Sequence, residues 1–356
     1  MKQKVRRIIA GLIIIMLLLP AAIFAKDKLI FAATLIRHGD RTPYYALKKD
    51  VHDWKLGLGQ LTPIGMHEEH QTGANLRKLI IDKYKLLPLV YDNNLMYVRS
   101  GDCDRVLMSA ESFLSGFYPL GTGPVLGNKK PALPERFQPI PIHTVPITKD
   151  NIINPNSVNP DKFNELVNKY SYTMPSWIEM NKKYQAQFAR WSKIFGQKIT
   201  SLAPIIMIGD NLNVRRIHKV PYPKGITEKE AKTLAWLSLW GETQQYLPVE
   251  VGVFQAKHLL KQIADDMGSA IHGKENYKYI LYSGHDSTII GVMSAIKEPL
   301  NAATYPPYAS NINFMLFRDN DKYTVRIVYN DHKNNLPDSG QTSFTLEQFI
   351  EMTKQM

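Results

Sequence analysis

The residues with the clearest chemical potential lie in segment 37–43, which reads RHGDRTP. Arg37 and Arg41 are four positions apart, and each guanidinium offers a fixed fork of donors that matches a small oxyanion bidentately. His38 lies between these cations, where a neutral imidazole is a candidate nucleophile. Gly39 lets the backbone turn tightly and approach a ligand. The segment therefore predicts an oxyanion pocket that contains a nucleophile, although the tripeptide RHG alone also occurs by chance in turns.

A second group of candidates lies about 250 residues further on, in segment 283–288, which reads SGHDST. His285 adds another imidazole, and Asp286 adds a carboxyl group that can give or accept a proton. A His-Asp pair is common by chance, so its value depends on its place in the fold.

A third guanidinium, Arg105, lies in the segment 99–105, which reads RSGDCDR and is expected to open a helix. A helix N-terminus presents free amides and the positive end of the helix dipole to an anion. Arg105 could instead form a salt bridge with Asp102 or Asp104. Those two carboxylates could also suggest a magnesium site, but a role in holding arginines and capping the helix is preferred.

Three strands are expected to position these residues: apolar strands at 29–36 and 279–282, and a strand that ends at 97–100. The two apolar strands end directly before a candidate segment and the other ends within the segment 99–105, and ligands of α/β proteins bind at the carboxyl ends of strands. The arrangement predicts an α/β fold in which the three segments converge.

Together these motifs resemble those of the histidine acid phosphatases, the branch of the histidine phosphatases that includes acid phosphatases and phytases. The signature RHGxRxP is matched at 37–43, the leading LTPxG pattern at 61–65 and the His-Asp motif at 285–286, and the resemblance covers essentially the whole mature chain. It implies a central mixed, mostly parallel sheet flanked by helices, with an inserted helical cap.

The resemblance also implies roles for individual residues. His38 would attack phosphorus and form a phosphohistidine, and Asp286 would be the proton donor to the leaving oxygen. The phosphoryl oxygens would be bound by four residues: Arg37, Arg41, Arg105 and His285. The family needs no metal, so we expect no cofactor.

The His-Asp-Ser-Thr segment and the chain around Tyr308 look more like the broad-specificity prostatic and lysosomal type of this family than like its phytases. We therefore expect an acid phosphatase acting on small phosphomonoesters, including aryl phosphates, with phosphotyrosine peptides as further candidates, in a chain that could form a homodimer. A phytase or sugar phosphatase is the alternative within the family. A non-catalytic binder of phosphate or anionic lipid is the alternative outside it, but a binder has no use for both His38 and Asp286.

The first 25 residues are predicted to be a signal peptide, with a basic start, an apolar stretch at 8–19 and a plausible cleavage region ending at Ala25. An uncleaved anchor is the alternative, but the stretch is shorter than the roughly 20 residues of a spanning helix. Cleavage would lower the formal charge of the 356-residue chain from +12 to +8, since residues 1–25 hold four basic residues and no acidic one. The remaining cations are scattered, which argues against nucleic-acid binding. We expect a periplasmic or secreted protein without a stable membrane anchor.

The expected domains are a catalytic core at 26–120 and 250–356 and a mainly helical cap at 121–249. The cap would begin with a Gly- and Pro-rich linker and hold helices at 177–198 and 228–240, with a break at 208–211. Its tryptophans are expected mainly in the core of the cap rather than on a substrate platform.

Three further features have less bearing on function. The single cysteine, Cys103, allows no intrachain disulfide and is expected to be a small buried residue rather than a catalytic thiol. His67 and His70 share a helix but lack the spacing of a zinc protease, so solvated residues are expected. Thr345 and Gln348 form a candidate capping box for the final helix.

Overall fold

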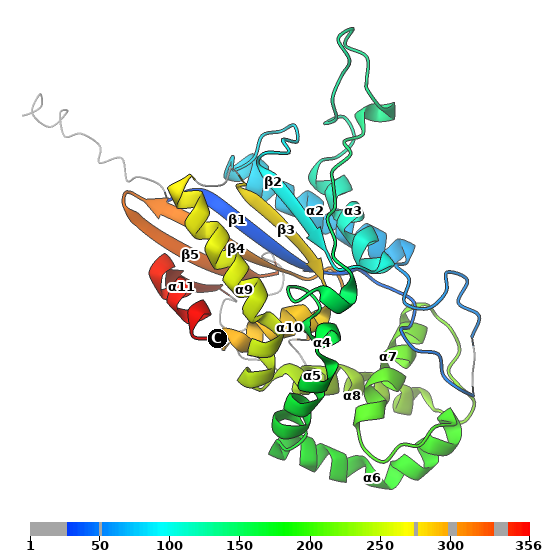
Figure 1. The fold of residues 1–356 in the computed structure, drawn as a ribbon. Helices are drawn as coiled ribbons and strands as arrows, with labels where there is room; N and C mark the ends of the chain where they lie inside the picture. Colours follow the sequence, from blue (N-terminus) through cyan, green and yellow to red (C-terminus); the bar gives the residue numbers. More distant parts are fainter. Residues whose placement is uncertain (1–26, 50–51, 274–276, 298–304, 331–340) are drawn as a thin grey trace, which may run out of the picture.

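A six-stranded mixed sheet forms the centre of the computed structural model, which describes residues 27–49, 52–273, 277–297, 305–330 and 341–356 (Figure 1). The strand order is β2-β3-β1-β4-β5-β6, and the first three of these are parallel while the others are antiparallel. The strands are β1 (Lys28–Arg37), β2 (Met96–Ser100), β3 (Tyr279–Gly284), β4 (Asn311–Asp319), β5 (Lys322–Tyr329) and β6 (Gln341–Thr345).

The central strand β1 is buried on both faces, as its continuous apolar sequence predicts. Phe31, Ala33 and Leu35 face one layer of helices, and Ala32 and Ile36 face the other. This alternation follows from the two-residue period of a strand. The sheet is therefore held between two hydrophobic clusters, and its central strand is rigidly fixed.

Helices cover both faces of the sheet (Figure 1). The first layer holds α2 (Pro63–Arg77), which continues as a π-helical turn (Lys78–Lys83), and α3 (Asp104–Phe117). The second layer holds α9 (Val249–His272), α10 (Asp286–Ala295) and α11 (Leu346–Lys354). The predicted capping box of Thr345 and Gln348 at the start of α11 is confirmed.

Three longer helices form a separate layer beside the carboxyl end of β3, and we call them the cap helices (Figure 1). They are α6 (Pro175–Phe195), α7 (Ala203–Ile217) and α8 (Glu228–Tyr246). Their own hydrophobic cluster includes Trp177, Trp191 and Trp240, whereas Trp236 is 42% exposed. The cap helices thus have a core of their own.

The predicted break at 208–211 is wrong, because α7 runs through it without interruption. Gly209 lies where α7 packs closely on α8, and a Cβ atom there would lie 2.1 Å from the carbonyl oxygen of Leu234. The glycine therefore permits close helix packing rather than a turn.

Shorter elements connect these layers. They are the 3₁₀ turns Pro134–Arg136 and Ile147–Lys149, the helices α4 (Pro155–Val158) and α5 (Pro160–Leu166), and the π-helical turn Val167–Ser171. The segment between α3 and α4 projects away from the body of the molecule (Figure 1). Strand β6 was not expected from the sequence.

The predicted fold class is confirmed: a mixed sheet is flanked by helices. The signal peptide predicted at 1–25 lies outside the described residues, and the domain boundaries at 121 and 249 stay predictions. Within the described part of the chain, no helix combines the length and apolarity that a membrane crossing requires.

Candidate active site

The three parallel strands bring the candidate segments to one edge of the sheet. Arg37, the last residue of β1, pairs in register with Gly284, the last residue of β3, and Ser100 of β2 pairs with Ser283. The amide of His38 donates to the carbonyl of Gly284 over 3.0 Å. The carboxyl ends of the strands and the N-termini of α3 and α10 therefore surround one site, as expected for an α/β fold.

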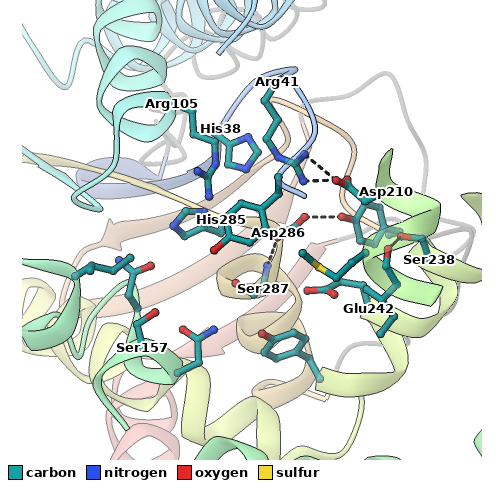
Figure 2. Close-up of a pocket in the computed structure, with 18 residues that line it drawn as sticks. His38, Arg41, Arg105, Ser157, Asp210, Ser238, Glu242, His285, Asp286 and Ser287 are labelled. Atoms are coloured by element: carbon teal, nitrogen blue, oxygen red, sulfur yellow. Dashed lines mark hydrogen bonds and ion pairs between the residues drawn. The ribbon is translucent and has the colours of Figure 1, made fainter. Parts of the chain in front are cut away.

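A cavity of about 260 Å³ opens at this edge. Five of the six predicted site residues line it: His38, Arg41, Arg105, His285 and Asp286. Figure 2 shows Arg41, Arg105 and His38 on one side of the cavity and Ser157, Ser238 and Glu242 on the other. The sixth residue, Arg37, is not part of the lining.

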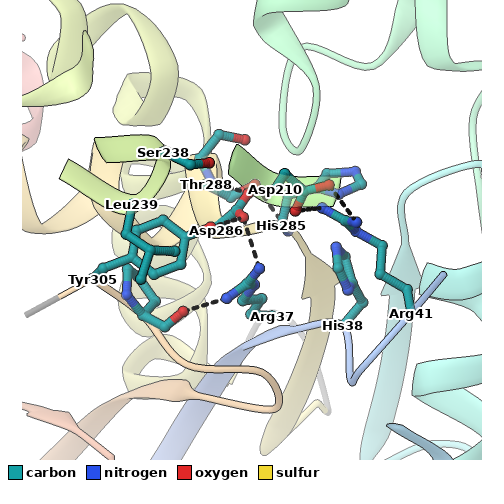
Figure 3. Close-up of polar contacts among 12 residues, drawn as sticks. Arg37, His38, Arg41, Asp210, Ser238, Leu239, His285, Asp286, Thr288 and Tyr305 are labelled. Carbon is teal, nitrogen blue, oxygen red and sulfur yellow. Dashed lines mark hydrogen bonds and ion pairs between the residues drawn. The ribbon is translucent and has the colours of Figure 1, made fainter. Parts of the chain in front are cut away.

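Arg37 is almost fully buried, and its guanidinium points toward Asp286 (Figure 3). Its Nη2 atom is 2.9 Å from Oδ2 of Asp286, and its Nη1 atom donates to the carbonyl of Pro306. The guanidinium also lies 4.3 Å from the ring centroid of Tyr308. A planar cation held on several sides can hold Asp286 in place and still attract an anion in the cavity.

The geometry of His38 leaves one ring nitrogen available for chemistry. Nδ1 lies 2.9 Å from the carbonyl oxygen of Gly39, which can only accept, so Nδ1 carries the proton and Nε2 has a free lone pair. Burial, followed by the charges of Arg105 and Arg37, holds the pKa of His38 well below its usual value. The imidazole is therefore neutral, and therefore nucleophilic, even in acid.

His285 and Arg105 complete the phosphate side of the cavity. His285 is the N-cap of α10, and its ring meets that of His38 edge to face with centroids 5.7 Å apart. Burial, followed by Arg105, lowers the pKa of His285 to about 3, so this ring is also neutral. Arg105 in the first turn of α3 forms no ion pair with Asp102 or Asp104, which are both exposed. Its guanidinium thus lines the cavity without a bound carboxylate.

Asp286 begins α10 and is held in its ionised form. Its Oδ2 atom accepts from the hydroxyl of Tyr305 and pairs with Arg37, and its Oδ1 accepts from the amide of Ser287 over 2.9 Å. Burial would raise the pKa of Asp286, but the Arg37 guanidinium, followed by the hydrogen bond from the Tyr305 hydroxyl, lowers it far below its usual value. In the free protein Asp286 is therefore a carboxylate.

Two contacts join the 38–43 loop to the cap helices, and the sequence did not reveal either. Arg41 donates to both carboxylate oxygens of Asp210 on α7, each over 3.0 Å. Asp40 accepts from Thr62, the N-cap of α2, and its Oδ2 lies 2.7 Å from Nε2 of His218 at the end of α7. No local pattern marks Asp210 or His218, because their partners lie more than 160 residues away.

Glu242 on α8 was also missed. It lies four residues after Ser238 and four before Tyr246, and all three line the cavity. Residues four apart lie on one face of a helix, so this spacing could have revealed the stripe once α8 was known to face the site.

Other residues of interest lie outside the cavity lining. Cys103 is half-buried at the N-cap of α3 rather than in the core as expected, and burial raises the pKa of its thiol, which disfavours the thiolate. His67 is exposed, while His70 lies 3.0 Å from the hydroxyl of Ser115. Gly39 has a specific packing role, because a Cβ atom there would lie 2.4 Å from the carbonyl oxygen of Gly65.

Comparison with known proteins agrees with this geometry. The model of the histidine phosphatase superfamily (branch 2) matches residues 28–330. The chain is 30% identical to human prostatic acid phosphatase over 331 residues, which is 90% of this chain and 81% of that protein. It is 29% identical to the lysosomal acid phosphatase of Xenopus laevis over 339 residues, or 92% of this chain and 75% of that protein.

Solved structures show the same fold. The phytase of Klebsiella sp. ASR1 superposes with a TM-score of 0.67 at 14% identity, covering 93% of this chain and 96% of that one. Hafnia alvei phytase in complex with myo-inositol hexakis sulphate gives a TM-score of 0.64 at 16% identity, covering 93% and 97%. The predicted family is confirmed: the chain belongs to the histidine phosphatase superfamily, branch 2, and is a histidine acid phosphatase.

Proposed function

We propose that this chain hydrolyses small phosphomonoesters through a phosphohistidine formed on His38, with Asp286 as proton donor. The observation that carries the proposal is the state of His38: its Nδ1 proton is bound to the Gly39 carbonyl, and its Nε2 is free in a cavity lined by Arg41 and Arg105. A neutral nucleophile surrounded by cations suits attack on an anionic phosphoryl group.

In the first step Nε2 of His38 forms a bond to phosphorus while the bond from phosphorus to the alcohol oxygen breaks. Arg41, Arg105 and His285 donate to the phosphoryl oxygens, where charge must be stabilised in the transition state. In the second step water attacks phosphorus, the bond to His38 breaks, and inorganic phosphate leaves.

Asp286 must carry a proton to serve the alcohol oxygen, but the free protein holds it as a carboxylate. A bound phosphoryl group supplies negative charge beside Asp286 and competes with it for Arg37. Both effects raise the pKa of Asp286, so the proton is taken up together with substrate. The proton then passes to the leaving oxygen, and Asp286 accepts one from the attacking water. This coupling favours turnover in acid.

Hydrolysis of p-nitrophenyl phosphate across the pH range, with excess chelator, tests the proposal. We expect chelator-resistant activity with a maximum in acid. After a brief reaction with phosphate-labelled substrate, a rapid quench without acid should leave the label on His38 as a phosphohistidine. His38→Ala should abolish both signals. His67→Ala is the matched control, because it removes an exposed histidine outside the cavity.

Loss of activity with chelator would show that hydrolysis depends on a metal ion, and it would contradict the proposal. Tight phosphate binding without turnover at any pH would support the non-catalytic binder instead.

Export is part of the proposal. It is supported by the signal-like sequence of residues 1–25 and by the lysosomal name of one relative. N-terminal sequencing of the protein recovered outside the cytoplasm should find a start close to Lys26. A homodimer and activity on phosphotyrosine peptides stay predictions, and so does a phytase as the alternative activity.

A further inference from the structure

Three carboxyl groups line the cavity, and two of them are paired. Asp286 pairs with Arg37, and Asp210 pairs with Arg41. Glu242 is different, because no hydrogen bond or ion pair joins its side chain to any residue within the described ranges. Glu242 is half-buried and lines the cavity, so its carboxyl group, which has no protein partner among the described residues, is available to a ligand.

The wall around Glu242 carries neutral polar groups. Ser238, Glu242 and Tyr246 form a stripe along α8, and Asn156 and Ser157 of α4 line the same cavity. Figure 2 shows Ser157 on the same side of the cavity as Ser238 and Glu242. The only cations among the described lining residues are Arg41 and Arg105, both on the phosphate side. The described cap side therefore offers hydrogen bonds but no positive charge.

This division has a consequence for the alcohol part of a substrate. When the phosphoryl group lies between His38 and the arginines, the alcohol extends toward the α8 stripe. A second phosphate there would meet carboxyl groups instead of the cations that bind phosphate. A hydroxyl group, by contrast, can both donate to and accept from a carboxyl group.

The electrostatics of Glu242 agree with a hydroxyl partner. Burial, followed by the charges of Asp286 and Asp210, raises the pKa of Glu242 to about 8. In acid Glu242 is therefore a neutral carboxylic acid, which has one O–H to donate and an oxygen to accept.

We propose that Glu242 is a specificity-determining residue that binds a hydroxyl of the leaving alcohol, so that the enzyme prefers monophosphates of polyols or sugars to esters bearing several phosphates. The inference rests on the proposed function, since it uses the same phosphoryl position. It separates this chain functionally from the phytases that share its fold.

The test compares glycerol 1-phosphate with propyl phosphate, which has the same carbon chain but no free hydroxyl. We expect Glu242→Leu to lower the ratio of kcat/KM for these two substrates about tenfold, the effect of losing about one hydrogen bond. Glu242→Gln, which can still donate and accept, should restore most of the ratio. Glu179→Leu is the matched control, because it removes an exposed glutamate from cap helix α6 and should leave the ratio unchanged.

Phytate provides a second measurement. The wild type should hydrolyse it with a kcat/KM at least tenfold below that for glycerol 1-phosphate. Equal kcat/KM for the two substrates, or a glycerol-to-propyl ratio that Glu242→Leu leaves unchanged, would overturn the inference.

The two proposals fail in different ways. If the wild type hydrolyses p-nitrophenyl phosphate in a His38-dependent manner while either of those results is found, only the role of Glu242 is lost. If the wild type hydrolyses none of these esters, the proposed function itself is lost.

Discussion

The two walls of the cavity differ in origin and in charge. The sheet-edge wall is built from strand ends and helix N-termini, and it holds His38, Arg41, Arg105 and His285. The cap wall is built from helices α7 and α8, and it holds Asp210, Ser238 and Glu242. The sheet-edge wall acts on the part that all phosphomonoesters share, while the cap wall faces the part in which they differ.

This difference predicts which property of the enzyme a mutation in each wall should change. Changes in the sheet-edge wall should lower turnover for every ester, and changes in the cap wall should alter the choice among esters. Substitutions at Asp286 and Tyr305, at Asp210 and at Glu69 separate these effects.

Asp286→Asn tests the sheet-edge wall most severely. Removal of the proton donor should lower kcat for alkyl phosphates by about 10² to 10⁴. It should lower kcat for p-nitrophenyl phosphate much less, because that leaving group departs without a proton. The measurement is kcat against leaving-group pKa for a series of esters, which should become steeper in the variant. Asp265→Asn, at an exposed position of α9, is the control. An equal loss of kcat for all esters of the series would show that Asp286 does not donate the proton to the leaving oxygen.

Asp210→Asn tests whether the effect of a substitution on catalysis depends on the wall where the residue lies or on the residue that it contacts. Asp210 lies on the cap wall, but it holds Arg41 through two hydrogen bonds. We expect kcat/KM to fall about tenfold for all substrates alike, since loosening Arg41 weakens the shared phosphate site. Competition by inorganic phosphate against several esters measures the effect, with the exposed Asp161→Asn as control. A loss restricted to one class of alcohol would instead place Asp210 in substrate selection with Glu242.

Tyr305→Phe should change the pH profile more than the maximal rate. The Tyr305 hydroxyl donates to the Asp286 carboxylate and thereby lowers the pKa of Asp286. Without this bond the pKa rises, so the protonated donor persists to higher pH. The alkaline limb of the kcat profile should therefore move up by about one pH unit, the equivalent of one hydrogen bond to a charged group. A limb that moves down, or does not move, would contradict this account of the donor.

Glu69→Gln should affect stability rather than catalysis. Glu69 is fully buried on α2, and neither of its carboxylate oxygens has a hydrogen-bond partner among the described residues. Burial, followed by Glu68, raises its pKa well above 4.5.

The sign of the effect follows from this shift. The folded state binds the proton more tightly than the unfolded state, so the contribution of Glu69 is fully present below the unfolded pKa and is lost as the pH rises through the folded pKa. Between the unfolded pKa of about 4.5 and the higher folded pKa, Glu69 should therefore lower the free energy of unfolding by about 1.4 kcal/mol per pH unit. Denaturant titrations should show that slope missing in Glu69→Gln and retained in the exposed control Glu111→Gln.

The sheet-edge wall was largely predictable from sequence because its residues lie within five positions of a strand end. Arg37 and His38 at the end of β1, and His285 and Asp286 at the end of β3, are placed by the local strand and by parallel pairing. Even so, the sequence could not show that Arg37 pairs with Asp286 and is not part of the cavity lining.

The cap wall was not predictable for a physical reason. Asp210 and Glu242 lie within helices α7 and α8, and a carboxyl group on a helix usually faces solvent. Only the packing of α7 and α8 turns them inward, and that packing is set by contacts such as the one at Gly209. The same packing explains why a glycine that suggested a break lies inside a continuous helix.

The ties between the 38–43 loop and α7 bear on how such enzymes can be recombined. Exchanging the cap helices for helices that lack Asp210 and His218 would leave Arg41 and Asp40 without these partners. Arg41 would then lose a largely buried ion pair, a change that commonly costs about 3–5 kcal/mol. A chimaera made to acquire a new substrate range would therefore have to keep both residues at their positions on α7. The residues of the 38–43 loop and their partners on α7 therefore have to be kept together in any such exchange.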